Sequence, residues 1–184
     1  LEKDSRIKAV GEIGLDFYWD KSSRDSQRER FRQQLELARD LDRPVVIHSR
    51  DAEEDTMEIL RETGFAHRPL LWHCFGLDAD FASRVLACGW TVSVPGMLTF
   101  KKAHTLRRAV ATIPLDRLVL ETDCPFLAPE PYRGKTNEPS LIPLIADQVA
   151  RLHDLDREAV LRATAETAHR FFGLAGSQEA GNRR

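Results

Sequence analysis

Short apolar runs alternate with amphipathic stretches along most of the chain. Continuous β-branched or other apolar runs predict buried strands, whereas apolar residues at helical spacing predict helices. The predicted strands are 7–14, 45–47, 69–72, 90–94 and 118–122. The predicted helices are 27–41, 51–63, 80–88, 101–113, 140–153 and 156–172. This alternation is typical of right-handed βαβ units around a parallel sheet, so an α/β fold is expected.

The spacing of the strands leaves two architectures open. The strand ends lie about 28 residues apart, close to the roughly 31 residues per unit of a (β/α)₈ TIM barrel. Five strands form either a complete doubly wound sheet or the last five units of a barrel whose first three strands are missing from the chain. On the barrel interpretation, residues 1–174 are the C-terminal portion of one barrel domain. Residues 175–184, rich in Gly, Ser and charge, are expected to form a flexible tail.

Composition narrows the class of protein. The chain has 184 residues, 42% of them hydrophobic and 30% charged, and a formal net charge of −2. Such a balance predicts a soluble domain and gives no sign of a long basic groove for nucleic acid. We expect no membrane segment and no secretory leader. The three cysteines are odd in number and far apart, which predicts a reducing, cytoplasmic location.

Four of the five strand ends carry side chains that bind metals: Glu12, His48, His73 and Asp123. In a parallel barrel all strand carboxyl ends face one side, so these residues are expected to converge. A single histidine after a strand is more often hydrogen-bonded than metal-bound, but four such ends together favour a metal site. Imidazoles with carboxylates suit Zn²⁺, Mn²⁺ or Fe²⁺, and a carboxylate-rich site also accepts Mg²⁺. Two such cations can activate a water and clamp a phosphoryl group.

Two other features bear on chemistry. The loop 132–139 follows the strand of Asp123 and carries Arg133 and Lys135 around a glycine. Such a loop either binds a phosphate or is a solvated, charged connection. Cys74 and Cys124 lie next to candidate ligands, and both are predicted to be small buried hydrophobic side chains rather than thiolate ligands.

Six motifs occur together and in order. They are Gly-Glu-Ile-Gly-Leu-Asp (11–16), Pro-Val-Val-Ile-His-Ser-Arg (44–50), Trp-His-Cys-Phe (72–75), Pro-Gly-Met-Leu-Thr-Phe-Lys (95–101), Glu-Thr-Asp-Cys-Pro (121–125) and Tyr-Arg-Gly-Lys (132–135). From about residue 7 to 174 the chain resembles the TatD family of metal-dependent deoxyribonucleases, in the amidohydrolase-like barrel superfamily. The resemblance implies a (β/α)₈ barrel that hydrolyses DNA, often as a 3′-to-5′ exonuclease.

The resemblance also implies roles for individual residues. Glu12 would bridge two divalent metals, with Mg²⁺ as the usual activator and Zn²⁺ or Mn²⁺ as alternatives. His48 and His73 would be ligands, and Asp123 would be both a ligand and the proton acceptor for the attacking water. Arg133 and Lys135 would lie near the substrate phosphate. DNA is then the expected partner, with no obligate protein partner.

One departure from the family pattern matters for activity. The family begins with a His-x-His pair on its first strand, and no such pair occurs in this chain. We therefore expect a natural protein longer by about 80 residues, at 25–30 residues per barrel unit. Two alternatives stay open: a metal-dependent hydrolase of a small ester, amide or lactone, and a catalytically impaired fragment that lacks the His-x-His ligands.

Overall fold

The computed structural model describes residues 4–19 and 21–174, so the predicted tail lies outside the described residues. The strands are β1 (Val10–Asp16), β2 (Val45–Arg50), β3 (Leu70–Trp72), β4 (Thr91–Val94) and β5 (Leu118–Leu120). The α-helices are α1 (Arg24–Asp40), α2 (Glu53–Glu62), α3 (Ala79–Ala87), α4 (His104–Val110), α5 (Ile142–His153) and α6 (Arg157–Phe172). Short 3₁₀ helices are η1 (Phe65–His67), η2 (Gly96–Thr99), η3 (Leu115–Arg117) and η4 (Pro139–Leu141).

The five predicted strands and six predicted helices are all present, with shifted boundaries. Helix α1 begins earlier than predicted because the Ser23 hydroxyl accepts a hydrogen bond from the Ser26 amide and caps the first turn. Helix α4 begins later than predicted. The Arg107 guanidinium donates to the carbonyls of Leu98, Phe100 and Lys101, which holds that segment in a turn outside the helix.

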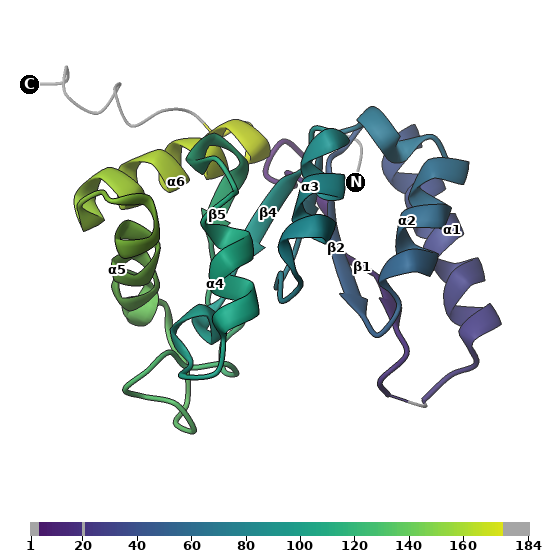
Figure 1. The fold of residues 1–184 in the computed structure, drawn as a ribbon. Helices are drawn as coiled ribbons and strands as arrows, with labels where there is room; N and C mark the ends of the chain where they lie inside the picture. Colours follow the sequence, from purple (N-terminus) through teal and green to yellow (C-terminus); the bar gives the residue numbers. More distant parts are fainter. Residues whose placement is uncertain (1–3, 20, 175–184) are drawn as a thin grey trace, which may run out of the picture.

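The sheet is parallel, and each strand pairs with the next one in the chain, in the order β1-β2-β3-β4-β5. A doubly wound sheet reverses its strand order at a switch point, and this sheet does not. The α/β class with a parallel sheet is therefore confirmed, and the doubly wound alternative is wrong. Figure 1 shows the helices following the strands along the sheet, from α1 and α2 beside β1 and β2 to α5 and α6 beside β5.

Burial on both faces of the sheet explains the continuous apolar runs. Every residue of β4 is buried, as expected for a parallel strand covered on each side. Helices contribute large side chains to the same core. Its largest fully buried members include Trp72, Trp90, Phe31, Phe65, Phe75, Leu15, Leu35, Ile47, Met57 and Leu60. This packed core holds the strand ends, and the side chains they carry, in a fixed arrangement.

Gly14 allows β1 and β2 to lie close together because it has no side chain. Gly14 pairs with His48 in the register of the two strands and has a φ of 146°. A Cβ added at Gly14 would lie 1.9 Å from the carbonyl oxygen of His48. A side chain at this position would therefore push apart the two strands that carry Glu12 and His48.

The three cysteines are all free. Cys74 is half-buried, and burial raises the pKa of its thiol above the ordinary range. Cys124 is exposed, so the prediction of a buried side chain is wrong. The reason is local: Asp123 has a φ of 55° and its carbonyl accepts a hydrogen bond from the Phe126 amide, so Cys124 lies in a turn outside the sheet.

Among the described residues, no helix has the length and apolar character needed to cross a membrane.

Candidate metal centre

Three of the four candidate ligands meet towards the carboxyl edge of the sheet, although Glu12 lies four residues before the end of β1 and not at the strand end as predicted. Glu12 lies in β1, His48 lies in β2, and His73 follows directly after β3. Because the strands are parallel, their carboxyl ends share one edge. One possible ligand atom from each of these three residues lies within 4.8 Å of the others. Asp123 follows β5 by three residues and lies beside this group.

Glu12 bridges the two histidines with its two carboxylate oxygens. Its Oε1 lies 3.0 Å from Nε2 of His73, and its Oε2 lies 3.0 Å from Nδ1 of His48. Two ligands of one cation, each about 2.1 Å from it, are separated by no more than about 4.2 Å. The spacing of the three side chains therefore fits a shared divalent cation.

Two carboxylates that were not among the predicted site residues contact the ring nitrogens of the histidines that do not face Glu12. Asp16 Oδ2 lies 3.0 Å from Nε2 of His48, and Glu121 Oε2 lies 2.7 Å from Nδ1 of His73. Metal-binding histidines commonly hydrogen-bond a carboxylate through the nitrogen that does not bind the metal. The i, i+2 spacing from Glu12 to Gly14 to Asp16, which places them on one face of β1, is a signal that would have found Asp16.

Charge coupling within this group shifts its pKa values. The hydrogen bond to Glu12 raises the pKa of His48, and the same contact lowers the pKa of Glu12. Burial lowers the pKa of His73, but the hydrogen bond and charge of Glu121 outweigh it, so the net direction is upward. In the metal-free protein these imidazoles therefore bind protons more tightly than ordinary histidines do, and a cation would compete with those protons.

Asp123 differs from the other carboxylates. Its Oδ1 lies 3.8 Å from Nε2 of His73, at the margin of the three-residue group. Burial raises the pKa of Asp123, as do the charges of Glu121 and Glu12, despite the opposing charge of His73. A carboxylate with a raised pKa is a better proton acceptor than an ordinary one.

The residues present fit a divalent metal on two grounds. The donor set combines imidazole and carboxylate, which first-row divalent cations prefer. In addition, Glu121 Oε1 is buried and has no hydrogen-bond partner within the described part of the chain, although Oε2 binds His73 and Ser93. The alternative grouping of His73, Cys74 and Glu121 is less suitable, because burial raises the pKa of the Cys74 thiol and so makes the thiolate that a metal needs more costly to form.

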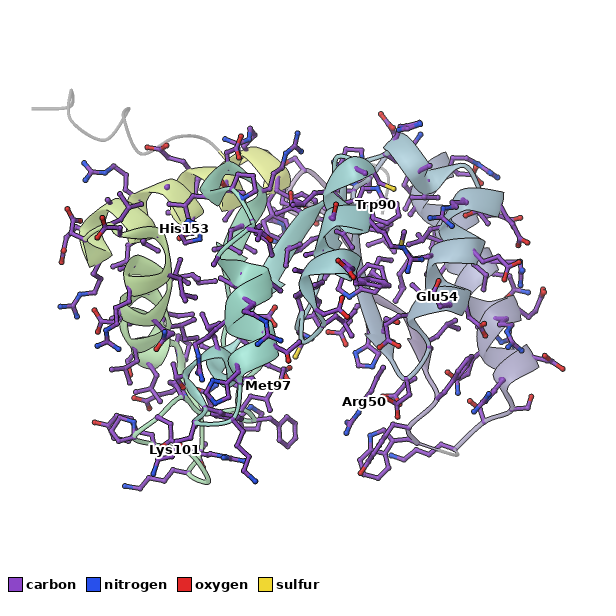
Figure 2. The ribbon with its side chains drawn as sticks, in the orientation of Figure 1. Arg50, Glu54, Trp90, Met97, Lys101 and His153 are labelled. Atoms are coloured by element: carbon purple, nitrogen blue, oxygen red, sulfur yellow. The ribbon has the colours of Figure 1, made fainter. Side chains whose placement is uncertain are left out.

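A cavity of about 620 Å³ opens over the candidate ligands. Glu12, His48, His73 and Asp123 all line it, as do Arg50 and Met97. Figure 2 shows Met97 and Arg50 near the middle of the lower part of the molecule, Met97 to the left and Arg50 to the right. The candidate ligands therefore share one cavity with a guanidinium and a thioether side chain.

The predicted phosphate loop lies outside this cavity. Arg133 and Lys135 are exposed, and neither lines the cavity. The Arg133 guanidinium lies 4.3 Å from the centre of the Phe100 ring, and Lys135 Nζ lies 5.6 Å from that of Tyr132. Among the described residues, the arginine or lysine that lines the cavity is Arg50, at the end of β2.

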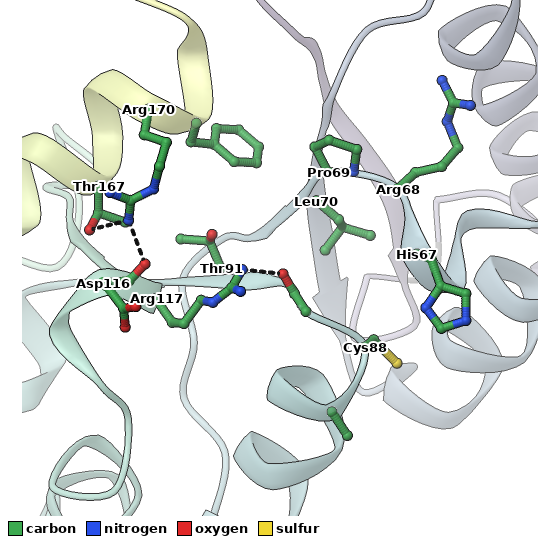
Figure 3. Close-up of a pocket in the computed structure, with 13 residues that line it drawn as sticks. His67, Arg68, Pro69, Leu70, Cys88, Thr91, Asp116, Arg117, Thr167 and Arg170 are labelled. Atoms are coloured by element: carbon green, nitrogen blue, oxygen red, sulfur yellow. Dashed lines mark hydrogen bonds between the residues drawn. The ribbon is translucent and has the colours of Figure 1, made fainter. Parts of the chain in front are cut away.

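A second cavity, of about 520 Å³, lies at the amino-terminal end of the strands (Figure 3). Two of the three arginines that line it, Arg117 and Arg170, donate to backbone carbonyls. Arg170 of α6 donates to the Asp116 carbonyl at 2.7 Å, and Arg117 donates to the Gly89 carbonyl at 2.6 Å. These bonds attach α6 and η3 to the starts of the strands. This end of the sheet therefore has a structural role, as is usual for the amino-terminal face of a barrel.

A family model for TatD-related DNases matches residues 1–173. This chain belongs to that family. The metal-dependent hydrolase YabD of Bacillus subtilis is 43% identical over 174 residues, covering 95% of this chain and 68% of the relative. The metal-dependent hydrolase YcfH of Escherichia coli K12 is 37% identical over 178 residues, covering 97% and 67%. Membership of the TatD family groups the chain with metal-dependent hydrolases, in agreement with the sequence analysis.

A solved structure has the same fold. The crystal structure of YjjV, a TatD homologue from Escherichia coli K12, aligns with a TM-score of 0.85 at 27% identity. The alignment covers 92% of this chain and 65% of that one. This TatD-family chain therefore spans about two thirds of the length of the relatives that it matches.

Proposed function

We propose that this chain carries part of the active site of a metal-dependent hydrolase that cleaves phosphodiester bonds in DNA. The observation that carries the proposal is the bridge formed by Glu12 between His48 and His73, in the lining of a cavity of about 620 Å³. The description of the family as DNases supports the choice of substrate. Exonuclease action from the 3′ end belongs to the same proposal.

The side chains that line the cavity carry mostly negative charge, so an anionic substrate would need bound cations there. The described lining has one guanidinium and five carboxylates, which are those of Glu12, Asp16, Asp51, Glu53 and Asp123. A phosphodiester entering this field alone would be repelled. Divalent cations would offset this negative charge, because each is among the largest charges in a site of this kind.

Each residue has a definite task in the proposed reaction. Glu12, His48 and His73 would hold the cation, with Asp123 at the margin available to a second one. Bound divalent cations lower the pKa of water and clamp phosphoryl oxygens. Asp123 accepts the proton of the attacking water at its carboxylate, and Glu121 keeps Nε2 of His73 directed towards Glu12.

Three finer predictions remain part of the proposal. Three further strands, from a longer polypeptide, would close the sheet into a barrel and supply the His-x-His ligands. Arg133 and Lys135 would contact phosphates farther along the DNA strand, where contacts position the substrate without reading bases. A cytoplasmic location is supported by the three free cysteines.

Metal replacement with matched variants tests the function. The full-length protein is freed of metal with a chelator, given Mg²⁺, Mn²⁺ or Zn²⁺, and assayed on a labelled oligodeoxynucleotide. We expect no cleavage without metal, and a loss of about 10²–10⁴-fold in kcat for Asp123→Asn, the range for a general base. Glu12→Gln is expected to abolish metal-dependent cleavage. The same change at Glu36, which is exposed on α1, is the control and should retain full activity.

A neutral ester assayed in parallel separates the alternatives. Binding to DNA should weaken steeply as salt is raised, whereas hydrolysis of a neutral ester should not. Metal-dependent hydrolysis of the ester, without any cleavage of DNA, would refute the nuclease proposal in favour of a small-ester hydrolase. Inactivity on both substrates with every metal would favour an impaired protein.

A further inference from the structure

Two exposed aromatic rings follow β1, and the metal chemistry does not account for them. Tyr18 is 54% exposed and Trp19 is 53% exposed. Their ring centres are 4.9 Å apart in an edge-to-face arrangement. The guanidinium carbon of Arg50 lies 3.7 Å from the centre of the Tyr18 ring and 5.8 Å from that of Trp19. These contacts hold the rings in a defined orientation while leaving about half of each in water.

Asp16 joins this aromatic pair to the candidate metal centre. Its Oδ1 accepts hydrogen bonds from the backbone amides of Tyr18 at 3.0 Å and Trp19 at 3.1 Å. Its Oδ2 contacts His48 Nε2. The Gln27 side chain binds both the amide and the carbonyl of Asp16, each at 2.9 Å. One carboxylate therefore fixes the aromatic pair relative to a candidate ligand.

Trp19, one member of this pair, faces the space where substrate would bind. Trp19 and Arg50 line the 620 Å³ cavity together with Glu12 and His48. Figure 2 shows Arg50 at this end of the molecule, beyond the end of β2. A base attached to a phosphate at the metal centre would therefore share one cavity with the Trp19 ring.

Stacking on an aromatic ring suits a base whose face is free. Any base has a π face, so such stacking tolerates all sequences. In a duplex, neighbouring base pairs cover these faces, and a side chain can reach only the edges in the grooves. A half-exposed tryptophan braced by tyrosine and arginine is thus suited to an unpaired base.

We propose that Trp19, supported by Tyr18 and Arg50, forms a stacking subsite for one unpaired nucleobase next to the scissile phosphate. This proposal rests on the proposed nuclease function. It adds that the cavity recognises a base of the substrate in addition to its phosphate. It assigns the segment after β1 a role in substrate binding that is separate from metal binding.

Intrinsic fluorescence gives a test that needs no catalysis. Trp72 and Trp90, the other two tryptophans of this chain, are each 1% exposed. Trp72 also lines the cavity. Quenching is therefore assigned to Trp19 by repeating the titration with Trp19→Phe, in which the quenching due to this residue is lost. The probe is a thymidine tetramer with methylphosphonate linkages, whose neutral backbone is neither repelled by the carboxylates nor hydrolysed as a phosphodiester. The full-length protein is titrated with it and with a matched tetramer that lacks bases. We expect quenching and binding by the first tetramer alone.

Variants then assign the binding to the ring. With a dye-labelled tetramer followed by anisotropy, Trp19→Ala should weaken binding roughly tenfold or more, the effect of losing one stacked base. Trp19→Phe should recover most of this loss, because it retains an aromatic face. Leu37→Ala, an exposed apolar position on α1, is the control and should bind like the wild type.

The results separate the subsite from the nuclease function. Equal binding by both tetramers, or wild-type binding by Trp19→Ala, would overturn the subsite. If DNA is cleaved, Trp19→Ala should raise KM with little change in kcat, and an unchanged KM would count against the subsite alone. Base-dependent binding through Trp19 without cleavage by any metal-loaded form would refute the nuclease function and leave the subsite standing.

Discussion

At the scale of single residues, Glu121 illustrates how a supporting side chain controls a candidate ligand. Its Oε2 contacts Nδ1 of His73 and accepts a hydrogen bond from the Ser93 hydroxyl. It therefore selects the tautomer of His73 that leaves Nε2 free for a cation. Glu121 is therefore a positioning residue, since it acts through His73.

Removing the charge of Glu121 should weaken metal binding more than it weakens the fold. For Glu121→Gln we expect roughly 10–100-fold lower metal affinity, the usual effect of changing a side chain that supports a ligand. Competition with a fluorescent chelator measures the affinity, and circular dichroism monitors the fold. Glu58→Gln, at an exposed position on α2, is the matched control. Wild-type affinity in Glu121→Gln would refute the positioning role.

At the scale of elements, one side chain holds the long connection between β5 and η4. Asn137 is 3% exposed, and its Nδ2 donates to the carbonyls of Thr122 at 2.6 Å and Phe126 at 2.7 Å. The backbone amide of Asn137 donates to the Pro125 carbonyl. The loop segment that carries Asp123 is therefore anchored to the strand end by a single buried amide side chain.

Loss of this anchor should reduce both stability and activity. Asn137→Ala leaves two carbonyls without their donor, so we expect the free energy of unfolding to fall by about 1–3 kcal/mol. Because Asp123 lies in the released segment, kcat should fall further than the loss of folded protein explains. Urea unfolding and kinetics on the same preparations measure both quantities. Thr136→Ala, at the exposed neighbouring position, serves as control. A fully active but destabilised Asn137→Ala would contradict the link to Asp123.

At the scale of the whole molecule, the candidate metal centre links stability to pH. His48 and His73 have pKa values raised above 6.5, so the folded metal-free protein binds more protons than the unfolded chain just above that pH. Their contribution to stability is complete below the unfolded pKa and is lost as pH rises through the folded pKa. Glu12, whose pKa is lowered, contributes stability above 4.5 that is lost on acidification.

Chelated protein should therefore be less stable at about pH 8 than at about pH 6, near the ordinary pKa of histidine. Urea unfolding at the two pH values measures the difference. Added Zn²⁺ or Mn²⁺ should reverse this pH dependence, so that the protein is more stable at about pH 8 than at about pH 6. The reason is that a cation binds the deprotonated imidazoles and stabilises the folded state more at the higher pH. Replacing both histidines by glutamine should flatten the dependence in the chelated protein. Greater stability of the chelated wild type at pH 8 would contradict these pKa directions.

Local sequence patterns were enough to predict the strands, their parallel direction and which strands carry the candidate ligands. These follow from local patterns: apolar runs predict buried strands, and parallel strands share one carboxyl edge. Hence the neighbourhood of Glu12, His48 and His73 could be predicted without coordinates. The extent of helix α4 and the exposure of Cys124 could not, because hydrogen bonds of the adjoining turns decided them.

Which side chains support the candidate ligands, which line the cavity and which lie outside it depends on contacts between segments that are distant in the sequence. Glu121 and His73 lie 48 positions apart, and Asp16 and His48 lie 32 apart, so no local pattern reports their contacts. Arg133 lies on a loop of the predicted kind, yet it packs on Phe100 while Arg50 lines the cavity. Side-chain contacts of this sort depend on the relative placement of distant strands and loops, which is set when the whole core packs.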